Sequence, residues 1–176
     1  MLIHRKFAQP NKATFTMPAA REFVGRWLAG REVIVDPFAR NETLGTFTND
    51  IDPDSIAQYH MEARAFLRML VARGIKAHAI IFDPPYSPTQ IARSYRNAGM
   101  VVTRTDTQSA RLKGECRKLF RELAAPDCVV LSFGWNTVGM GEGWSTEEIL
   151  LLNHGGDHND TICQAIINHQ TTEVAA

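Results

Sequence analysis

The sequence predicts an α/β protein with a doubly wound, mostly parallel sheet and a C-terminal antiparallel hairpin. Short apolar runs near residues 32, 77 and 127 alternate with segments of helical periodicity, the order expected of a parallel sheet. The last two apolar runs flank a Gly-Gly pair at 155–156, which indicates a hairpin. With 176 residues, the chain suits a single domain spanning 1–176.

The N-terminal part begins with a helix predicted over residues 17–29, where apolar side chains recur at helical spacing. A glycine follows, and then a short apolar run predicts a buried strand at Glu32–Val35. A second strand is expected to end near Asp50. The Asp-Pro pair at 52–53 then supplies a helix cap and a first helical turn.

Residues 53–73 allow two interpretations. One long helix would align their apolar side chains on a single face, and periodicity alone favours it. The alternative is a short helix, a short strand near Tyr59–Met61 and a second helix from Glu62. Gly74 ends the segment in either case.

The C-terminal half starts with a clear strand at Ala77–Phe82, which two prolines stop. Residues 87–108 are polar and are expected to be irregular. Residues 109–124 predict an amphipathic helix, and residues 127–135 predict a fourth buried strand before the hairpin.

Composition excludes several protein classes. The chain is 44% hydrophobic and 22% charged, which is ordinary for a globular protein, and no apolar run is long enough for a membrane span or a signal peptide. Its three cysteines form no CxxC pair, so we expect no disulfide framework, no metal and a cytoplasmic location. The histidines of "HGGDH" at 154–158 are too weak a pattern to predict a metal site.

Charge is unevenly distributed although the net charge is zero. Between residues 93 and 121 the chain carries eight basic residues against two acids, whereas from residue 126 onward it has seven acids and no Lys or Arg. Such asymmetry is typical either of a face that binds a polyanion or of a solvated helix face. The basic residues are Arg93, Arg96, Arg104, Arg111, Lys113, Arg117, Lys118 and Arg121.

Three carboxylates, Asp36, Asp50 and Asp83, follow predicted strands. Ligands of an open parallel sheet bind beyond the carboxyl ends of its strands, although an Asp at that place is often a helix cap. The stretch Asp83-Pro84-Pro85-Tyr86 is more specific, because two prolines fix two φ angles and stiffen the turn. An exocyclic amino group needs an acceptor, and an extruded base needs a flat ring to stack on. The turn offers both.

These residues resemble the amino-group DNA methyltransferases, the adenine-N6 and cytosine-N4 enzymes. "DPPY" resembles their catalytic motif in its adenine-N6 form, "VIVDPFAR" at 33–40 resembles the loop that binds S-adenosylmethionine, and "FTMP", "NDIDP" and "YHMEARAFL" resemble further cofactor segments. The last of these favours the split interpretation of residues 53–73. The resemblance assigns cofactor contacts to Thr16, Met17, Asp36, Pro37, Phe38, Arg40, Asn41, Asp50, Ile51, Glu62 and Asp83, and catalytic roles to Asp83, Pro84, Pro85 and Tyr86. It implies a Rossmann-like methyltransferase fold.

Two departures qualify the resemblance. Arg40 and Glu42 replace the glycines that normally let the backbone approach the cofactor. The chain also lacks room for a separate target-recognition domain, so the basic stretch at 87–112 would contact the nucleic acid, most readily DNA. The residues expected to make nucleic-acid contacts are Arg93, Arg96, Arg104, Arg111, Lys113 and Lys118, of which the two lysines follow this stretch.

The resulting hypothesis is an S-adenosylmethionine-dependent methyltransferase that acts on adenine N6 in DNA, without a metal. Recognition of a target sequence would fall to a second copy of the chain or to a partner protein. Cytosine-N4 or RNA-base methylation remains an alternative within the enzyme class. A non-catalytic nucleic-acid-binding module with a degenerate cofactor loop is the alternative outside it.

Overall fold

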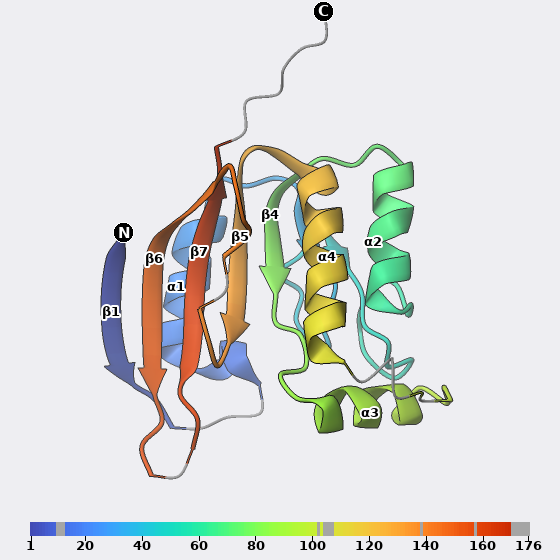
Figure 1. Cartoon of the computed structure of the whole chain (residues 1–176), viewed down its shortest axis with the longest axis horizontal. Coiled ribbons are helices and arrows are strands. Elements are labelled where there is room, and N and C mark those ends of the chain that lie inside the picture. Colours follow the sequence, from blue (N-terminus) through green and yellow to red (C-terminus); the bar gives the residue numbers. More distant parts are fainter. Residues whose placement is uncertain (10–12, 102, 104–107, 138, 157, 170–176) are drawn as a thin grey trace, which may run out of the picture.

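The computed structural model describes residues 1–9, 13–101, 103, 108–137, 139–156 and 158–169. Within this part of the chain, seven strands form one sheet in the order β1-β6-β7-β5-β4-β2-β3 (Figure 1). The strands are β1 (Leu2–Phe7), β2 (Ile34–Asp36), β3 (Phe47–Thr48), β4 (Ala77–Phe82), β5 (Ala124–Gly134), β6 (Trp144–Asn153) and β7 (Thr161–Asn168). The helices are η1 (Thr14–Thr16), α1 (Pro18–Leu28), α2 (Ala63–Ala72), α3 (Pro88–Asn97) and α4 (Ser109–Leu123).

The sheet is mixed in the way the sequence predicts. β3, β2, β4 and β5 are parallel neighbours, whereas β7 is antiparallel to both β5 and β6. The chain first moves outward from β2 to β3 and then crosses back to place β4 on the other side of β2. Such a reversal leaves a crevice beyond the carboxyl ends of the strands, which is where doubly wound sheets bind ligands.

Helices cover both faces of the sheet. α1 packs on one face against side chains such as Ile81 and Leu131, while α2 and α4 pack on the other against Ile80 and Val130. The central strands are buried on both faces, which explains their continuous apolar runs. Figure 1 shows α3 lying across the ends of α2 and α4, at the edge where β4 and β5 end. α3 therefore lies at the same end of the molecule as the carboxyl ends of β4 and β5.

Most predicted elements are confirmed. β4 covers the expected residues, α1 and α4 match their predicted helices within two residues, and β6 and β7 form the predicted hairpin. Between β3 and α2 the split interpretation is closer, because Tyr59 makes a parallel bridge with Asn49 and Glu62 caps α2. The helix expected from 52–53 is wrong: a turn lies there, in which Asp52 accepts a hydrogen bond from the amide of Asp54.

The prediction that residues 87–108 are irregular is wrong for α3. Ser87 caps this helix, since its hydroxyl accepts from the Gln90 amide at 3.2 Å while the Gln90 side chain accepts from the Ser87 amide at 3.2 Å. Pro88 occupies the first turn, where a missing amide hydrogen has no effect. Ile91 and Tyr95, one helical turn apart, anchor α3 in the core. The helix has only three buried apolar positions among many polar ones, so hydrophobic periodicity did not predict it.

β1 was not predicted either. Its side chains are all exposed, and it joins the sheet through parallel backbone pairing with β6, about 146 residues away in sequence. Because all six side chains of β1 are exposed, they show no alternation between buried and exposed positions, and the sequence gives no strand signal.

Replacing Ser87 with Ala should destabilise the protein by about 1 kcal/mol, because the capping hydroxyl is lost from α3. Urea denaturation followed by circular dichroism measures this difference. Thr89→Ala is the matched control: Thr89 is exposed in the first turn of the same helix, and its replacement should change stability by less than about 0.5 kcal/mol. Equal effects of the two variants would contradict the capping assignment.

Candidate active site

A cavity of about 540 Å³ lies beyond the carboxyl ends of β2, β3 and β4. This volume falls within the range of small-molecule and cofactor pockets, roughly 300–1,000 Å³. The cavity brings together most of the predicted site residues: Pro37, Phe38, Arg40, Asn41, Asp50, Ile51, Glu62, Asp83, Pro84, Pro85 and Tyr86. Segments far apart in sequence therefore form one site, as a topological switch point requires.

The carboxylate of Asp83 is held between two hydroxyl groups. Thr14 donates to its Oδ2 at 2.8 Å, and the hydroxyl of Tyr86 donates to its Oδ1. Burial raises the pKa of Asp83, while these two hydrogen bonds and the charge of Arg40 act in the opposite direction. Each oxygen has accepted one of these hydrogen bonds and can accept another. Asp83 is thus a fixed acceptor at the cavity wall.

The turn that carries Asp83 is tied to α3. The side-chain oxygen of Gln90 accepts from the backbone amide of Tyr86 at 2.7 Å as well as from Ser87. The Tyr86 ring packs edge-on against Trp135, with ring centroids 5.5 Å apart. Burial and the charge of Asp83 raise the pKa of Tyr86, which therefore remains a hydrogen-bond donor. Proline stiffness and these contacts together fix the relative positions of Asp83 and Tyr86.

Asp50 follows β3 and faces the cavity. Its Oδ2 accepts from the amide of Arg40 at 3.0 Å and its Oδ1 from the amide of Asp52 at 2.9 Å. Burial raises the pKa of Asp50, and both amide hydrogen bonds oppose that rise. Because each oxygen keeps acceptor capacity, the carboxylate can receive hydrogen bonds from two adjacent hydroxyl groups. This pattern of two acceptor oxygens fits the diol of a ribose.

Asp36 lies behind the cavity and does not line it. Its side chain is 1% exposed, Oδ1 accepts from the amide of Phe38 at 3.0 Å, and Oδ2 has no hydrogen-bond partner among the described residues. Burial, together with the charges of Asp83 and Asp50, raises the pKa of Asp36 to about 8. A protonated carboxyl is therefore the stable form at neutral pH. Its assignment to the cofactor stays a prediction.

Arg40 stands where the resembled loop has glycine, and it adopts a left-handed backbone conformation with φ of 51°. For a residue with a side chain, this conformation costs about 1–2 kcal/mol. The loop therefore keeps the backbone path that glycine would allow. The charge of Arg40 opposes the rise that burial causes in the pKa of both Asp83 and Asp50. The substitution adds a cation to a site crowded with carboxylates.

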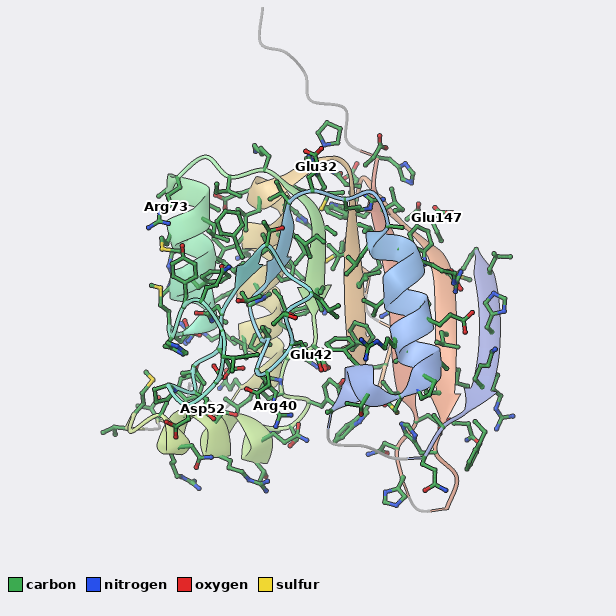
Figure 2. The ribbon with its side chains drawn as sticks, turned by 180° about the vertical axis from the view of Figure 1, so that it is seen from behind. Glu32, Arg40, Glu42, Asp52, Arg73 and Glu147 are labelled. Atoms are coloured by element: carbon green, nitrogen blue, oxygen red, sulfur yellow. The ribbon has the colours of Figure 1, made fainter. Side chains whose placement is uncertain are left out.

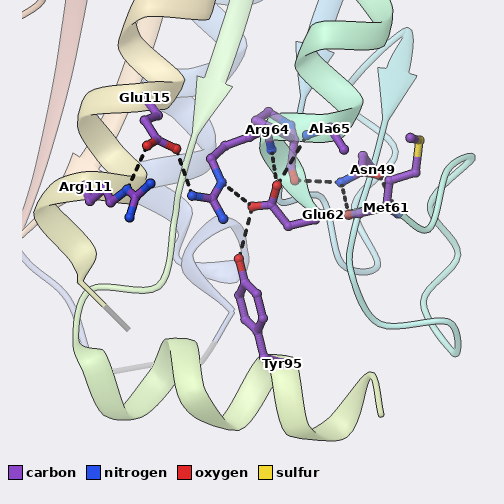
Figure 3. Close-up of polar contacts among 9 residues, drawn as sticks. Asn49, Met61, Glu62, Arg64, Ala65, Tyr95, Arg111 and Glu115 are labelled. Carbon is purple, nitrogen blue, oxygen red and sulfur yellow. Dashed lines mark hydrogen bonds and ion pairs between the residues drawn. The ribbon is translucent and has the colours of Figure 1, made fainter. Parts of the chain in front are cut away.

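Glu62 joins three helices at the cavity wall (Figure 3). Its carboxylate caps α2 by accepting from the amides of Arg64 and Ala65, and it also accepts from the Arg64 guanidinium at 2.9 Å and the Tyr95 hydroxyl at 3.0 Å. Arg64 in turn donates to Glu115 of α4 at 2.8 Å. With four hydrogen bonds accepted, Glu62 has little capacity left for a ligand. Its predicted contact with the cofactor's adenine stays a prediction.

The N-terminal segment contributes a different residue from those predicted. Thr16 donates to the carbonyl of Ala13 at 2.7 Å, and Met17 is buried in the core beneath α1. Thr14 instead lines the cavity and bonds to Asp83. The sequence holds two threonines two residues apart and gives no signal for choosing between them. The remaining lining residues that we did not predict are Asn49, Asp52, Asp54, Ser55, Ala63, Gln90, Ser94, Tyr95, Asn97, Leu112 and Thr161.

The predicted nucleic-acid residues do not form one uniform face. Arg93 lines the cavity, Arg96 and Lys118 are exposed, and Arg111 pairs with Glu115 at 2.9 Å. Lys113 is half-buried near Tyr86. Arg104 lies outside the described residues. Contacts of these residues with nucleic acid stay a prediction.

Neither a metal-binding cluster nor a membrane-spanning helix is found among the described residues. Those residues contain no group of three His, Cys, Asp or Glu side chains arranged to hold a metal ion. Nor do they contain a helix long and apolar enough to cross a membrane. The surface around the cavity carries scattered charges of both signs, including Glu42 and Asp52 near Arg40 (Figure 2).

Comparison with known proteins supports the fold. The solved structure of an Escherichia coli protein described as "Putative methyltransferase yhhF" matches with a TM-score of 0.57. The two chains share a fold. The match covers 94% of this chain and 93% of that chain, at 14% sequence identity. No family model and no curated protein sequence matches the chain. The similarity thus establishes the Rossmann-like architecture. The chemistry has to be inferred from the residues of the site.

Asp36 should make stability depend on pH. The folded-state pKa of about 8 lies above the unfolded value of about 3.9, so the protonated carboxyl stabilises the fold fully at low pH. This contribution declines as pH rises from about 4 to 8, by up to about 1.4 kcal/mol per pH unit. Urea denaturation of the parent and of Asp36→Asn at several pH values measures the two slopes. The free energy of unfolding should decline less steeply with pH in the variant than in the parent. Equal slopes in the two proteins would contradict a buried, protonated Asp36.

Proposed function

We propose that this chain is an S-adenosylmethionine-dependent methyltransferase that transfers a methyl group to the N6 amino group of adenine in DNA. The observation that carries the proposal is the Asp83-to-Tyr86 turn at the wall of a cofactor-sized cavity, with the Asp83 carboxylate fixed by two hydroxyl donors. The shared fold with a protein described as a methyltransferase supports it.

The residues of the cavity fit the cofactor. Asp50 offers two acceptor oxygens held by backbone amides, which suits the ribose diol, and Arg40 and Asn41 border the same space. S-adenosylmethionine, when bound, supplies an electrophilic methyl group on a sulfonium. Arg40 also offsets the carboxylate charges of this region. The cavity therefore combines a diol acceptor with a cation that offsets part of the carboxylate charge.

Asp83 would orient the attacking nitrogen. The amino group of adenine has two N–H donors, and the unused acceptor directions of Asp83 can take one of them, aligning the nitrogen lone pair with the methyl carbon. Transfer of the methyl group from the sulfonium would leave the nitrogen with one proton to release, and Asp83 would accept that proton on its way to solvent. The raised pKa of Asp83 suits this proton acceptance.

The base would enter beside Tyr86. The ring of Tyr86 lies three residues from Asp83 on a stiff turn, and Trp135 supports it from the other side. An aromatic ring next to the acceptor favours a planar heterocycle over an aliphatic amine as substrate. The protein thus acts through positioning and electrostatics, without a covalent intermediate.

Methyl transfer is tested directly with mixed-sequence DNA and S-adenosylmethionine, followed by digestion and mass detection of modified bases. N6-methyladenine is expected, and Asp83→Asn should lower its rate of formation about 100-fold or more, because a preorganised charged acceptor is lost. Asp54→Asn makes the same charge change at the cavity rim and should retain activity.

Other products would redirect or reject the proposal. Methylation at cytosine N4, or of RNA in a parallel reaction, would reassign the substrate. Cofactor binding without any methylated base would leave a non-catalytic module as the better description.

Asp50→Ala should weaken binding of S-adenosylmethionine by about 10- to 100-fold, because hydrogen bonds to a charged group contribute roughly 1.5–3 kcal/mol. Isothermal titration calorimetry measures the affinity, and circular dichroism confirms that the variant is folded. Asp52→Ala is a matched control, since among the described residues its carboxylate accepts from the amide of Asp54 in its own turn and from no backbone of the Asp50 loop. An unchanged affinity in folded Asp50→Ala would mean that Asp50 has a structural role alone.

A further inference from the structure

Two cations on α4 face the ends of β4 and β5. Lys113 and Arg117 are one helical turn apart and half-buried, and they border a hollow of about 10 Å³, room for about one water molecule. The hollow is completed by Phe82, the end of β5 at 132–134 and Asn136. This side of α4 faces away from Glu62 and Glu115.

Neither cation has a hydrogen bond or an ion pair with any described residue, although their neighbours do. Arg111 and Arg64 share Glu115, and Arg121 donates to the carbonyl of Met140. Burial and the charge of Arg117 lower the pKa of Lys113, and burial lowers the pKa of Arg117 as well. Two like charges at this spacing, both partly removed from water, destabilise the free protein. An anion placed between them would remove the cost.

Aromatic rings lie next to this pair. The Lys113 ammonium is 6.0 Å from the centroid of the Tyr86 ring, and Tyr86 in turn contacts Trp135, whose side chain is 42% exposed. Adjacent cations and exposed rings are the elements that bind a single polynucleotide strand, with cations on phosphates and rings on bases. The Tyr86 hydroxyl also bonds to Asp83, so one ring borders both the Lys113 ammonium and the proposed reaction centre.

We propose that Lys113 and Arg117 form a binding site for the phosphodiester adjacent to the base presented to Asp83, with Trp135 stacking on the neighbouring base. This inference rests on the proposed function and deepens it. It selects two of the eight basic residues as direct phosphate ligands. Exposed residues such as Arg96 and Lys118 would attract the phosphates electrostatically, without preferring one phosphate along the strand. The substrate would then be a strand separated from its complementary strand, and the protein would bind one base of it together with the adjacent phosphate.

The test uses the trinucleotide dT-dA-dT, in its natural form and with an uncharged methylphosphonate at either linkage, with affinities measured by calorimetry. The parent protein should bind one of the two methylphosphonates about 10-fold or more weakly than the natural trinucleotide, since a charged hydrogen bond to phosphate is lost. The variant Lys113→Gln with Arg117→Gln should bind the natural and the modified trinucleotides equally. Its Tm should be unchanged or higher, because two repelling charges are removed.

A matched variant carries Arg96→Gln and Lys118→Gln, which makes the same change in net charge on exposed positions. It should weaken the natural and the modified trinucleotides by the same factor and retain the parent's discrimination. Three outcomes would overturn the site. The parent protein could bind the natural and modified trinucleotides equally well, or fail to bind the natural one. Alternatively, the Lys113 and Arg117 variant could still prefer the natural trinucleotide.

The outcome is separable from that of the proposed function, because binding is measured without methyl transfer. Discrimination by the parent with no methylated product would reject the methyltransferase and keep the phosphate site. Methylated product with no discrimination would keep the enzyme and reject the site.

Discussion

Three carboxylates, Asp36, Asp50 and Asp83, meet at one edge of the sheet, and the surrounding structure is arranged to hold them there. Parallel strands bring their carboxyl ends together, so residues 14 to 47 positions apart in sequence become neighbours in a partly dehydrated space. Each carboxyl is accommodated differently: Asp50 by backbone amides, Asp83 by two hydroxyl groups, and Asp36 by retaining its proton. The two that can ionise face the cavity, and the protonated one lies behind them. Charge is thus placed where a ligand can use it.

Arg40 follows from the same constraint. A glycine at this position would be relaxed in the left-handed conformation, whereas Arg40 pays about 1–2 kcal/mol in backbone strain. Its guanidinium opposes the rise that burial causes in the pKa of Asp50 and Asp83, and its backbone amide donates to the Asp50 carboxylate. One residue therefore supplies both the turn geometry and the counter-charge. The departure from the glycine pattern, which in sequence alone suggests a degenerate loop, is compatible with a working cofactor site.

The sequence predicted the buried strands, the two amphipathic helices α1 and α4, the hairpin and most of the cavity, because each depends on local periodicity or on a residue at a strand end. It failed where the determining interaction is distant. β1 is held by backbone pairing with β6, and Thr14 meets Asp83 across 69 positions. The helix α3 escaped notice for a different reason: its signal lies in the cap at Ser87 and Gln90, and its few apolar side chains face a core formed mostly by other elements.

Tyr86 links the carboxylates to the cations of α4. Its hydroxyl bonds to Asp83, its ring lies beside the Lys113 ammonium, and its backbone is held by the side chain of Gln90 at the start of α3. The two faces of α4 differ correspondingly: on one, Glu115 neutralises Arg111 and Arg64, while on the other Lys113 and Arg117 have no acceptor among the described residues. The helix thus satisfies its charges on the side of Glu115 but not on the side of Tyr86, and the proposed phosphate would complete the second side. Because the same ring borders both groups, a base stacked on Tyr86 would bring its own phosphate to these cations.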